Sequence, residues 1–379
     1  MALFQTPDLD DRERRVLAQI DKLRERLRYL IGESPRRWQG LLRRNTFARA
    51  IQGSNSIEGY HVSVEDAVAA VDGEEPADTT TETWHAVRGY RAAMTYVMQM
   101  ADDPYFRFSP GIIKSLHFMM MEHDLTRNPG KWRPGSVYVR RESTGETVYE
   151  GPPAEQVPGL VDELVASVNS TGRPHATVAG AMVHLNLVMI HPFSDGNGRM
   201  ARCLQTLILA RHGVLSSVFS SIEEYLGRNT PSYYDVLAHV GQGRWHPDND
   251  ARPWLRYCLT AHFRQATTLL TRSREYERLW NELEQVLTRL KLPPRLAMGL
   301  SDAAVGLRIR NPTYRSVAEV SDQVAGKDLR MAVERGLLEA RGERRGRYYV
   351  ASPMLTEMRE RVREPTRVPD PFEDALFGE

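Results

Sequence analysis

The feature that most constrains the fold is a long apolar segment that leads into a short polar loop. Apolar side chains fill nearly every position of residues 175–190, on all sides of a helical projection. A helix that is apolar all round belongs in a core. Pro192 disfavours helical geometry at the residue before it, so the helix is predicted to end at His191. A second helical pattern runs from Arg199 to Gly213. The sequence therefore predicts a buried helix–loop–helix unit.

The loop between these helices has the chemistry of an anion site. Gly196, Asn197 and Gly198 allow positive φ and close backbone approach, so successive N–H groups can point inward and form a nest for phosphate oxygens. The positive end of the following helix faces the same space. Arg199 and Arg202 lie three positions apart on one face of that helix, where they can clamp phosphate.

Two further side chains in the loop add reactivity. Asp195 offers a hard oxygen ligand of the kind that Mg²⁺ prefers. His191 is the one group here that can exchange a proton near neutral pH. Each residue alone has an ordinary explanation, as a turn, a helix cap or a helix-end histidine. Their combination within twelve residues predicts a nucleotide-phosphate site with its own base.

Residues 191–202, HPFSDGNGRMAR, resemble the signature of the Fic family, His-Pro-Phe-x-Asp/Glu-Gly-Asn-Gly-Arg-x-x-Arg, and match it at every fixed position. The resemblance implies transfer of AMP from the co-substrate ATP onto a hydroxyl side chain of a target protein. By position it makes His191 the catalytic base, Asp195 the Mg²⁺ ligand and Phe193 a buried anchor of the loop. It assigns phosphate binding to Gly196, Asn197, Gly198, Arg199 and Arg202.

A second stretch, upstream, resembles the inhibitory motif of this family, Ser/Thr-x-x-x-Glu-Gly/Asn. A helical pattern from Leu41 ends in Ser54, Glu58 and Gly59, which occupy the three defined positions. In the family the glutamate pairs with the second arginine of the signature, here Arg202. A carboxylate held there would occupy a partner of the γ-phosphate, so the resemblance implies a self-inhibited enzyme.

Residues 130–153 interrupt the helical rhythm with two β-branched and aromatic runs around a turn at Thr144-Gly145. An isolated hairpin in a helical chain is marginally stable, which suggests a role beyond packing. The stretch resembles the Fic flap, whose strand edge docks a target segment. The docking residues are then Val137, Tyr138 and Val139.

Downstream, Asn229, Tyr233 and Tyr234 are weak candidates for the base and ribose pocket, because relatives place that pocket here and the tyrosines could equally be packing residues. His184 lies on the buried helix, two turns before His191, and is expected to be a satisfied core histidine. There is no Gly-x-x-x-x-Gly-Lys-Ser/Thr loop, which argues against an ordinary P-loop enzyme.

Three helical patterns (295–308, 314–321 and 322–336) and a hairpin with a basic tip look like a winged helix. Residues 291–351 carry twelve Lys and Arg against seven Asp and Glu, an excess that permits phosphate contacts without requiring them. We divide the chain into an N-terminal helical region with the inhibitory helix (1–80), a Fic domain (81–272), a helical linker (273–292), a winged helix (293–352) and a tail (353–379). Residues 357–379 of the tail are expected not to pack against the rest of the chain.

Composition sets limits on partners and location. The net charge is only +1, which gives no global case for nucleic acid or membrane binding. Two cysteines in apolar contexts argue against a disulfide framework and favour a reducing cytoplasm. We see no signal peptide and no apolar run long enough to span a bilayer.

The fold class is mainly α: a Fic-type helical core with a β-hairpin flap, followed by a winged helix. The expected function is Mg²⁺-dependent protein adenylyltransfer to Ser, Thr or Tyr hydroxyls of a target and of the chain itself, restrained by Glu58. Three alternatives stay open: removal of AMP from a modified protein, transfer of another nucleotide, and a nucleotide-sensing regulator that binds DNA through the winged helix. A homodimer is also open.

Overall fold

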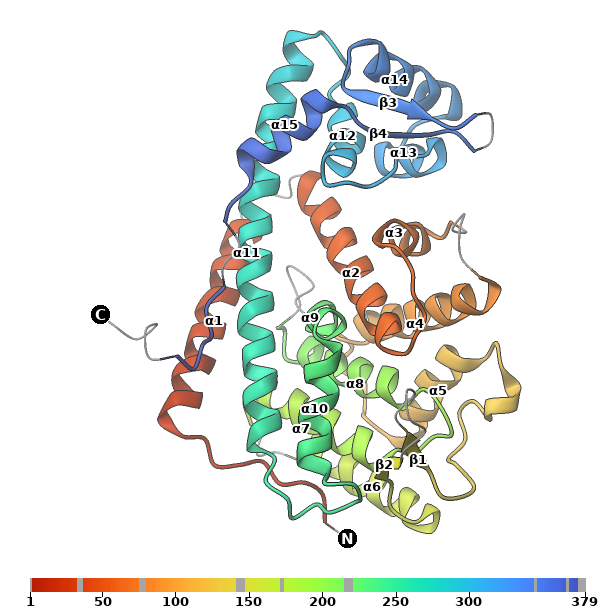
Figure 1. The fold of residues 1–379 in the computed structure, drawn as a ribbon, viewed down its shortest axis with the longest axis vertical. Helices are drawn as coiled ribbons and strands as arrows, with labels where there is room; N and C mark the ends of the chain where they lie inside the picture. The colour runs from red at the N-terminus through yellow and green to blue at the C-terminus, as the bar shows by residue number, and fades with distance from the viewer. Residues whose placement is uncertain are drawn as a thin grey trace.

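The computed structural model describes residues 2–32, 37–74, 80–140, 147–170, 174–214, 221–343, 346–365 and 368–373, most of them in helices (Figure 1). The helices are α1 (Asp11–Gly32), α2 (Arg37–Ile57), α3 (Val64–Asp72), α4 (Thr81–Gln99), α5 (Pro110–Met121), α6 (Val157–Asn169), α7 (Ala176–Ile190), α8 (Asn197–Arg211), α9 (Glu223–Arg228), α10 (Thr230–Gly241), α11 (Arg252–Arg289), α12 (Leu296–Ala304), α13 (Asn311–Ala318), α14 (Asp322–Glu334) and α15 (Pro353–Val362). Short 3₁₀ turns lie at Leu125–Arg127 and Ala154–Gln156. The strands are β1 (Tyr138–Arg140), β2 (Thr147–Glu150), β3 (Leu338–Arg341) and β4 (Tyr348–Ala351).

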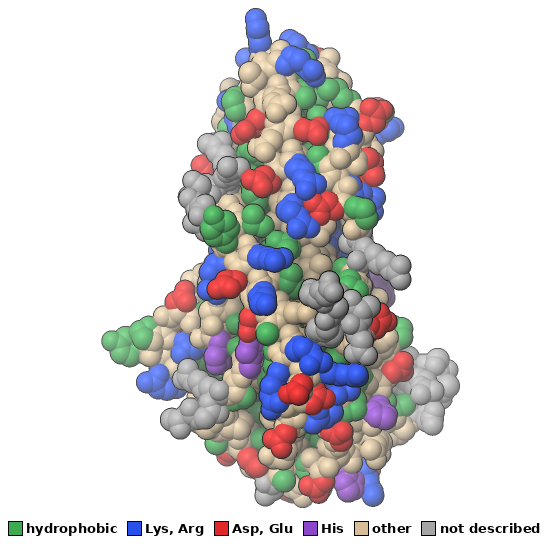
Figure 2. Space-filling model, turned by 90° about the vertical axis from the view of Figure 1, so that its left-hand side faces the viewer, with side chains coloured by type: hydrophobic (Ala, Val, Ile, Leu, Met, Phe, Trp, Pro, Cys, Tyr) green, Lys and Arg blue, Asp and Glu red, His purple; other side chains and the backbone are tan. Residues whose placement is uncertain are grey.

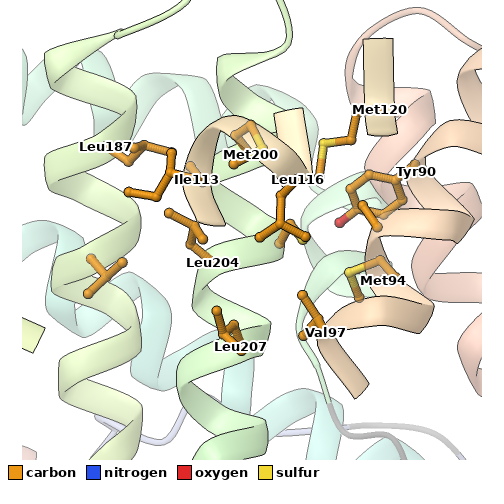
Figure 3. Close-up of a cluster of buried hydrophobic side chains, with 14 of the residues drawn as sticks. Tyr90, Met94, Val97, Ile113, Leu116, Met120, Leu187, Met200, Leu204 and Leu207 are labelled. Atoms are coloured by element: carbon orange, nitrogen blue, oxygen red, sulfur yellow. The ribbon is translucent and has the colours of Figure 1, made fainter. Parts of the chain in front are cut away.

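The predicted helix–loop–helix unit lies at the centre of the fold. α7 is buried on nearly all sides, because its sequence offers no polar face to solvent. α8 packs along it, and α4 and α5 cover the other side of α8. Figure 3 shows side chains of α4, α5, α7 and α8 converging in this core, among them Tyr90, Leu116, Leu187 and Leu204. The core holds the loop at 191–196 rigidly between two buried helices.

The predicted helical linker is part of a longer helix. Residues 252–289 form one continuous helix, α11, of 38 residues and therefore about 57 Å. The physical reason is that no proline or glycine follows Pro253 until Pro293. Figure 1 shows α11 running along one side of the molecule, from the Fic-like core to the C-terminal elements. The division into domains at 272/273 stays a prediction, and that boundary falls inside a helix.

Helix α2, which carries the predicted inhibitory motif, is anchored in two cores. Near its start, Trp38 and Leu42 are buried in the core formed with α11 and α12, whereas Ile51 packs in the core of α4, α5, α7 and α8. Between these points Arg44 donates to Asp302 of α12 at 2.7 Å. The position of α2 over the central loop is therefore fixed from both ends.

The C-terminal elements appear in the predicted order, three helices followed by a hairpin. β3 and β4 pair antiparallel from Leu338↔Ala351 to Arg341↔Tyr348, and Ile309 adds a bridge to Tyr349. Two residues of the predicted basic tip, 344 and 345, lie outside the described residues. The order of elements is the expected one, and the winged helix stays a prediction.

The predicted unpacked tail is wrong for the part of it that the structure describes. Ser352 caps α15 by accepting a hydrogen bond from the Leu355 N–H at 3.3 Å, and Leu355, Met358 and Val362 are buried. These three side chains recur at helical spacing, so the pattern was present in a segment that its charges made look solvated. Farther on, Phe372 packs under Arg256 of α11. Residues 366–367 and 374–379 lie outside the described residues.

On the face shown in Figure 2, basic and acidic side chains are interspersed. Arg252 and Arg256 of α11 both pair with Asp10 and Glu13 at the start of α1. This mixture gives no single-signed stripe of the kind that tracks a nucleic-acid backbone. Within the part of the chain that the structure describes, no helix is both long enough and apolar enough to cross a bilayer. Cys203 and Cys258 are buried and free.

Two glycines of α2 offer a matched test of the packing that supports the inhibitory motif. A Cβ on Gly53 would collide with the backbone of α9 at Glu223, 2.9 Å from its carbonyl carbon, whereas a Cβ on Gly40 meets nothing within 4 Å. We expect Gly53→Ala to lower the free energy of unfolding by about 1–3 kcal/mol through overpacking. Gly40→Ala should raise it by about 0.5–1 kcal/mol, because alanine is the better helix former. Urea unfolding of both variants checks the contrast, and equal effects would contradict the close α2–α9 contact.

Candidate active site

The candidate base lies at the end of α7. His191 has φ 51°, a left-handed conformation that a residue other than glycine adopts at a cost of order 1–2 kcal/mol. Its Nδ1 lies 3.1 Å from the carbonyl oxygen of Val188, which can only accept, so Nδ1 carries the proton of the neutral ring. The Nε2 lone pair is therefore left for another proton.

The surroundings of His191 favour this neutral form. Burial lowers the pKa of the imidazole, the Val188 carbonyl opposes that effect, and the Arg133 charge lowers it again. Glu58 acts in the opposite direction, since a negative charge nearby favours the protonated ring. The net result is a pKa below 6.5, and hence a ring that is deprotonated at neutral pH.

Asn197 has a more structural role than its predicted place in the phosphate cradle suggests. Its side-chain amide accepts from the Phe193 N–H and donates to the Phe193 carbonyl, both at 2.9 Å. Asn197 is 2% exposed, so this side chain is committed to bracing the loop. Phe193 is fully buried, as its predicted role as an anchor requires. Only the backbone N–H of Asn197 stays a candidate for phosphate binding.

The two glycines of the loop meet the steric demands that the sequence suggested. Gly196 has φ 75° and is the residue immediately before α8. A Cβ on Gly198 would collide with the carboxylate of Glu58 and lie 3.1 Å from Nη1 of Arg202. The start of α8 is thus open to close approach by an anion, and in this structure the carboxylate of Glu58 fills that place.

Two buried guanidinium groups project from α8 with incomplete hydrogen bonding. Arg199 and Arg202 are each 1% exposed. Within the described residues, Nε and Nη1 of Arg199 and Nη1 of Arg202 have no hydrogen-bond partner. Among the described residues, the Arg199 guanidinium donates to Met121 Sδ at 3.0 Å, and a thioether is a weak acceptor. Each unsatisfied buried donor costs about 1–3 kcal/mol, so this pair favours an incoming ligand rich in oxygen acceptors.

The predicted contact between Glu58 and Arg202 is present. Arg202 Nη2 donates to Glu58 Oε1 at 2.7 Å and to the Ser54 carbonyl at 2.9 Å, and its Nε donates to Ser54 Oγ at 2.8 Å. Burial opposes ionisation of Glu58, but the charges of Arg202 and Arg199 outweigh it and hold the pKa of Glu58 below its usual value. Gly59 follows with φ 82°, which ends the motif in a tight turn. The carboxylate is therefore charged at neutral pH and occupies one of the two arginines.

Asp195, at the mouth of the loop, has the chemistry of a Mg²⁺ ligand. Its Oδ1 accepts from the Gly196 N–H at 2.6 Å, and its Oδ2 lies 3.8 Å from the exposed Arg127. Within the described residues there is no cluster of three or more His, Cys, Asp or Glu side chains around a common point. A single hard oxygen fits an ion whose other ligands are phosphates and water.

The predicted flap is present and is tied to the loop. β1 pairs with β2 in the register Tyr138↔Glu150 and Val139↔Tyr149, and the predicted turn at 144–145 lies outside the described residues. Arg133 Nε donates to the His191 carbonyl at 2.8 Å, while the Tyr149 hydroxyl donates to the Met189 carbonyl at 2.8 Å. The hairpin and the end of α7 therefore hold each other in position.

The weak base-pocket candidates fall in different environments. Tyr233 is 1% exposed and its hydroxyl lies 2.9 Å from Nε2 of His184, so both are packing residues in the core, as expected for His184. Tyr234 is 46% exposed and donates to the Ile57 carbonyl at 3.0 Å, next to the inhibitory motif. The Asn229 amide donates to the Tyr225 carbonyl at 2.8 Å. Of the three, Tyr234 is the most exposed, and it lies beside the inhibitory motif.

Three residues at the site were missed by the sequence analysis. Tyr60 lies with its ring 5.1 Å from the Arg199 guanidinium carbon, Arg133 joins the flap to His191, and His117 contacts the loop directly. The sequence signal for His117 was a polar residue on the apolar face of α5, beside Ile113 and Met120. Such a residue must find a partner when buried.

Known proteins resemble this chain in the region of the site. Residues 107–209 match the model of the Fic/DOC family, so the chain carries a Fic domain. The match includes the flap and residues 191–202, whereas the inhibitory motif at 54–59 lies outside it.

Curated relatives include an Aedes aegypti protein named protein adenylyltransferase Fic, 27% identical over 217 residues, and a Caenorhabditis elegans protein named protein adenylyltransferase fic-1, 26% identical over 254 residues. The alignments cover 56% and 66% of this chain, but only 40% and 46% of those proteins.

Solved structures show the same fold. A Fic family protein from Desulfovibrio desulfuricans superposes with a TM-score of 0.58 at 24% identity, covering 92% of this chain and 98% of that one. Residues 134–508 of Fic-1 from C. elegans superpose with a TM-score of 0.56 at 22% identity, covering 68% of this chain and 72% of that one. The first match includes most of this chain, so the likeness extends beyond the Fic domain.

Proposed function

We propose that this protein is an adenylyltransferase that moves AMP from ATP to a Ser, Thr or Tyr hydroxyl of a target protein and of itself. The observation that carries the proposal is the pair of buried, under-satisfied guanidinium groups of Arg199 and Arg202 on the helix that follows a deprotonated His191. The names of the curated relatives, protein adenylyltransferases, support the same activity.

The chemistry follows from these groups. His191 Nε2 accepts the proton of the target hydroxyl as that oxygen attacks the α-phosphorus of ATP. A new O–P bond forms, the bond to the β-phosphate oxygen breaks, and pyrophosphate leaves. Arg199, Arg202 and the N–H groups at the start of α8 hold the β- and γ-phosphates and stabilise the developing charge. Asp195 would hold Mg²⁺, which when bound adds charge stabilisation between the phosphates.

Glu58 restrains this reaction in the proposal. Its carboxylate accepts a hydrogen bond from Arg202 and fills the space beside Gly198. Without Glu58, a phosphate oxygen would lie there. Because like charges repel, ATP could bind beside an ionised Glu58 only in a displaced position. Release of α2 from α8 would then restore the full phosphate site. Ser54 stabilises the restrained state through its two contacts with Arg202.

The flap offers one strand edge to a target. The outer edge of β2 is already engaged, because Glu150 N–H donates to the Gly243 carbonyl at 2.9 Å and its carbonyl accepts from Trp245 at 3.0 Å. Within the described residues, β1 pairs only with β2, so its other edge is open. Tyr138 on β1 is 47% exposed. We propose that the target segment adds to β1 with the help of Val137, Tyr138 and Val139.

Location and further partners belong to the same proposal. We place the protein in the cytoplasm on the basis of its two free cysteines. DNA binding by the C-terminal elements and homodimer formation are the two remaining partner hypotheses. A salt-sensitive gel shift and sedimentation of the pure protein test them.

The pH dependence of transfer has a definite sign. Transfer needs neutral His191, whose pKa burial lowers below 6.5, so the rate should rise through an acid limb and be level from about pH 7 upward. In Glu58→Gly the limb should move to lower pH, since the nearby negative charge that raises this pKa is gone. The pH–rate profile of self-modification checks this, and an acid limb centred above pH 7 would contradict it.

The decisive experiment offers wild-type and Glu58→Gly protein each labelled nucleoside triphosphate in turn, together with a cell lysate. Mass spectrometry then reads the mass of the added group and its acceptor residue. Addition of AMP to a hydroxyl supports the proposal. Addition of another nucleotide, or release of AMP from a modified protein that depends on Glu58, would replace it.

A further inference from the structure

His117 on α5 is fully buried and contacts the signature loop and the chain that leads to the flap. Its Nδ1 lies 2.8 Å from the backbone nitrogen of Gly130, and its Nε2 lies 3.0 Å from the carbonyl oxygen of Asp195. The ring also stacks face to face on Phe193, with centroids 3.7 Å apart and an interplanar angle of 3°. All three contacts are made by one imidazole.

These contacts determine where the proton of the ring lies. The Gly130 N–H can only donate, so Nδ1 must be the unprotonated nitrogen. The Asp195 carbonyl can only accept, so Nε2 must carry the proton and donate to it. A neutral ring satisfies both bonds in one tautomer, whereas the other tautomer would lose both. Burial lowers the pKa of His117 to about 4, in keeping with a neutral ring.

The peptide that His117 holds is one that needs an external restraint. It joins Asp195, the candidate metal ligand, to Gly196, which has φ 75°. Glycine adopts positive and negative φ at similar cost, so the loop sequence alone does not fix the orientation of this peptide. The Asp195 carboxylate also accepts from the Gly196 N–H at 2.6 Å, and the Gly196 carbonyl accepts from Met200 at 3.0 Å to begin α8. A rotated Asp195–Gly196 peptide would break the first of these bonds.

We propose that His117 is a positioning residue for the proposed transfer: through its Nε2–H bond to the Asp195 carbonyl, it orients the Asp195–Gly196 peptide so that the carboxylate and the first N–H groups of α8 face the nucleotide phosphates. The inference rests on the proposed function. It assigns to His117 a role exerted through the Asp195–Gly196 peptide. The second hydrogen bond of His117, accepted from the Gly130 N–H, fixes the orientation of the ring itself.

Two amide substitutions separate the two hydrogen bonds. In His117→Gln the side-chain amide reaches the position of Nε2 and can still donate to the Asp195 carbonyl. In His117→Asn the amide oxygen reaches the position of Nδ1 and can still accept from Gly130, but the bond to Asp195 is lost. His117→Phe keeps the ring on Phe193 and loses both bonds. All three are made in the Glu58→Gly protein, with folding checked by circular dichroism and thermal unfolding.

We expect kcat for self-modification to fall about 10- to 100-fold in the Asn and Phe variants, because small displacements of a site group have effects of that size. The Gln variant should stay within about threefold of its parent, since it keeps the positioning bond. A purely packing role predicts a different order, with Phe the least impaired. Equal loss in Asn and Gln, or an active Phe variant, would overturn the inference.

A readout that does not depend on catalysis is the ring tautomer. Long-range ¹H–¹⁵N spectra of histidine-labelled protein should show His117 with a protonated Nε2 and an unprotonated Nδ1, and the His117→Phe spectrum gives the assignment. The opposite tautomer would overturn the inference. If the Glu58→Gly parent shows no transfer at all, the proposed function fails and this inference with it. If the parent transfers but the Asn variant equals it, only this inference fails.

Discussion

Replacing Glu58 by glycine is expected to raise self-modification by about 5- to 150-fold, the range of a coupling free energy of roughly 1–3 kcal/mol between a restraining contact and a site. The carboxylate that lies 2.7 Å from Arg202 Nη2 and above Gly198 would be absent. The freed arginine and the open start of α8 could then take the γ-phosphate. Incorporation of label from ATP measures the rate, and calorimetry should show tighter ATP binding.

Two controls sharpen this test. Glu58→Gln keeps the size of the side chain and removes its charge, so it should give a smaller rise than glycine. Glu65→Gly, on α3, removes another carboxylate that pairs with an arginine, here Arg308 at 3.1 Å. Glu65 lies outside the site described above. It should leave self-modification unchanged. Labelling of Glu58→Gly at the wild-type level would remove the inhibitory role.

Replacing His191 by alanine in the Glu58→Gly protein is expected to lower transfer by about 10²–10⁴-fold, the usual contribution of a positioned base. The hydroxyl of the target would then have to lose its proton to water. ATP binding should change little, because the imidazole in the proposal acts on the target hydroxyl and makes no contact with the β- or γ-phosphate. The measurement is the initial rate of labelling at saturating ATP.

The chain offers a matched control for this substitution in His212. It too is a histidine at a helix end, with its Nδ1 2.8 Å from the Ile208 carbonyl, although its side chain is exposed where that of His191 is half-buried. His212→Ala should therefore remove a similar side-chain contact at a helix end and leave the rate of transfer unchanged. An active His191→Ala protein, or equal losses in both variants, would show that His191 is not the base.

Some of this architecture could be predicted from local sequence because the information is local. The end of α7 follows from Pro192, and the polar loop follows from two glycines around Asn197. The flap was visible as β-branched runs in a helical chain. The helical continuation of α11 could also be predicted, since no proline or glycine interrupts it before Pro293, although its composition changes from apolar to charged near residue 270.

Other features depended on contacts between distant residues. The buried side of α15 is set by Leu355 and Met358, whose spacing is helical, but only the core between α11 and α12 gives that side a reason to be buried. Asn197 looked like part of the phosphate cradle because of its neighbours, and the structure shows its amide bound to Phe193 instead. His117 had no motif to mark it.

By itself the sequence determined the chemistry in the loop: which groups can move a proton, hold a metal or bind phosphate, and that helices flank them, because these properties belong to residue types and short spacings. Only the tertiary structure decided which of them are free to act. The pairing of Glu58 with Arg202 spans 144 residues, and the His117 bond to the loop spans 78. Such contacts arise when buried polar groups find partners across a packed core. The resemblance to a family motif implied the first of them, whereas no local pattern records the second.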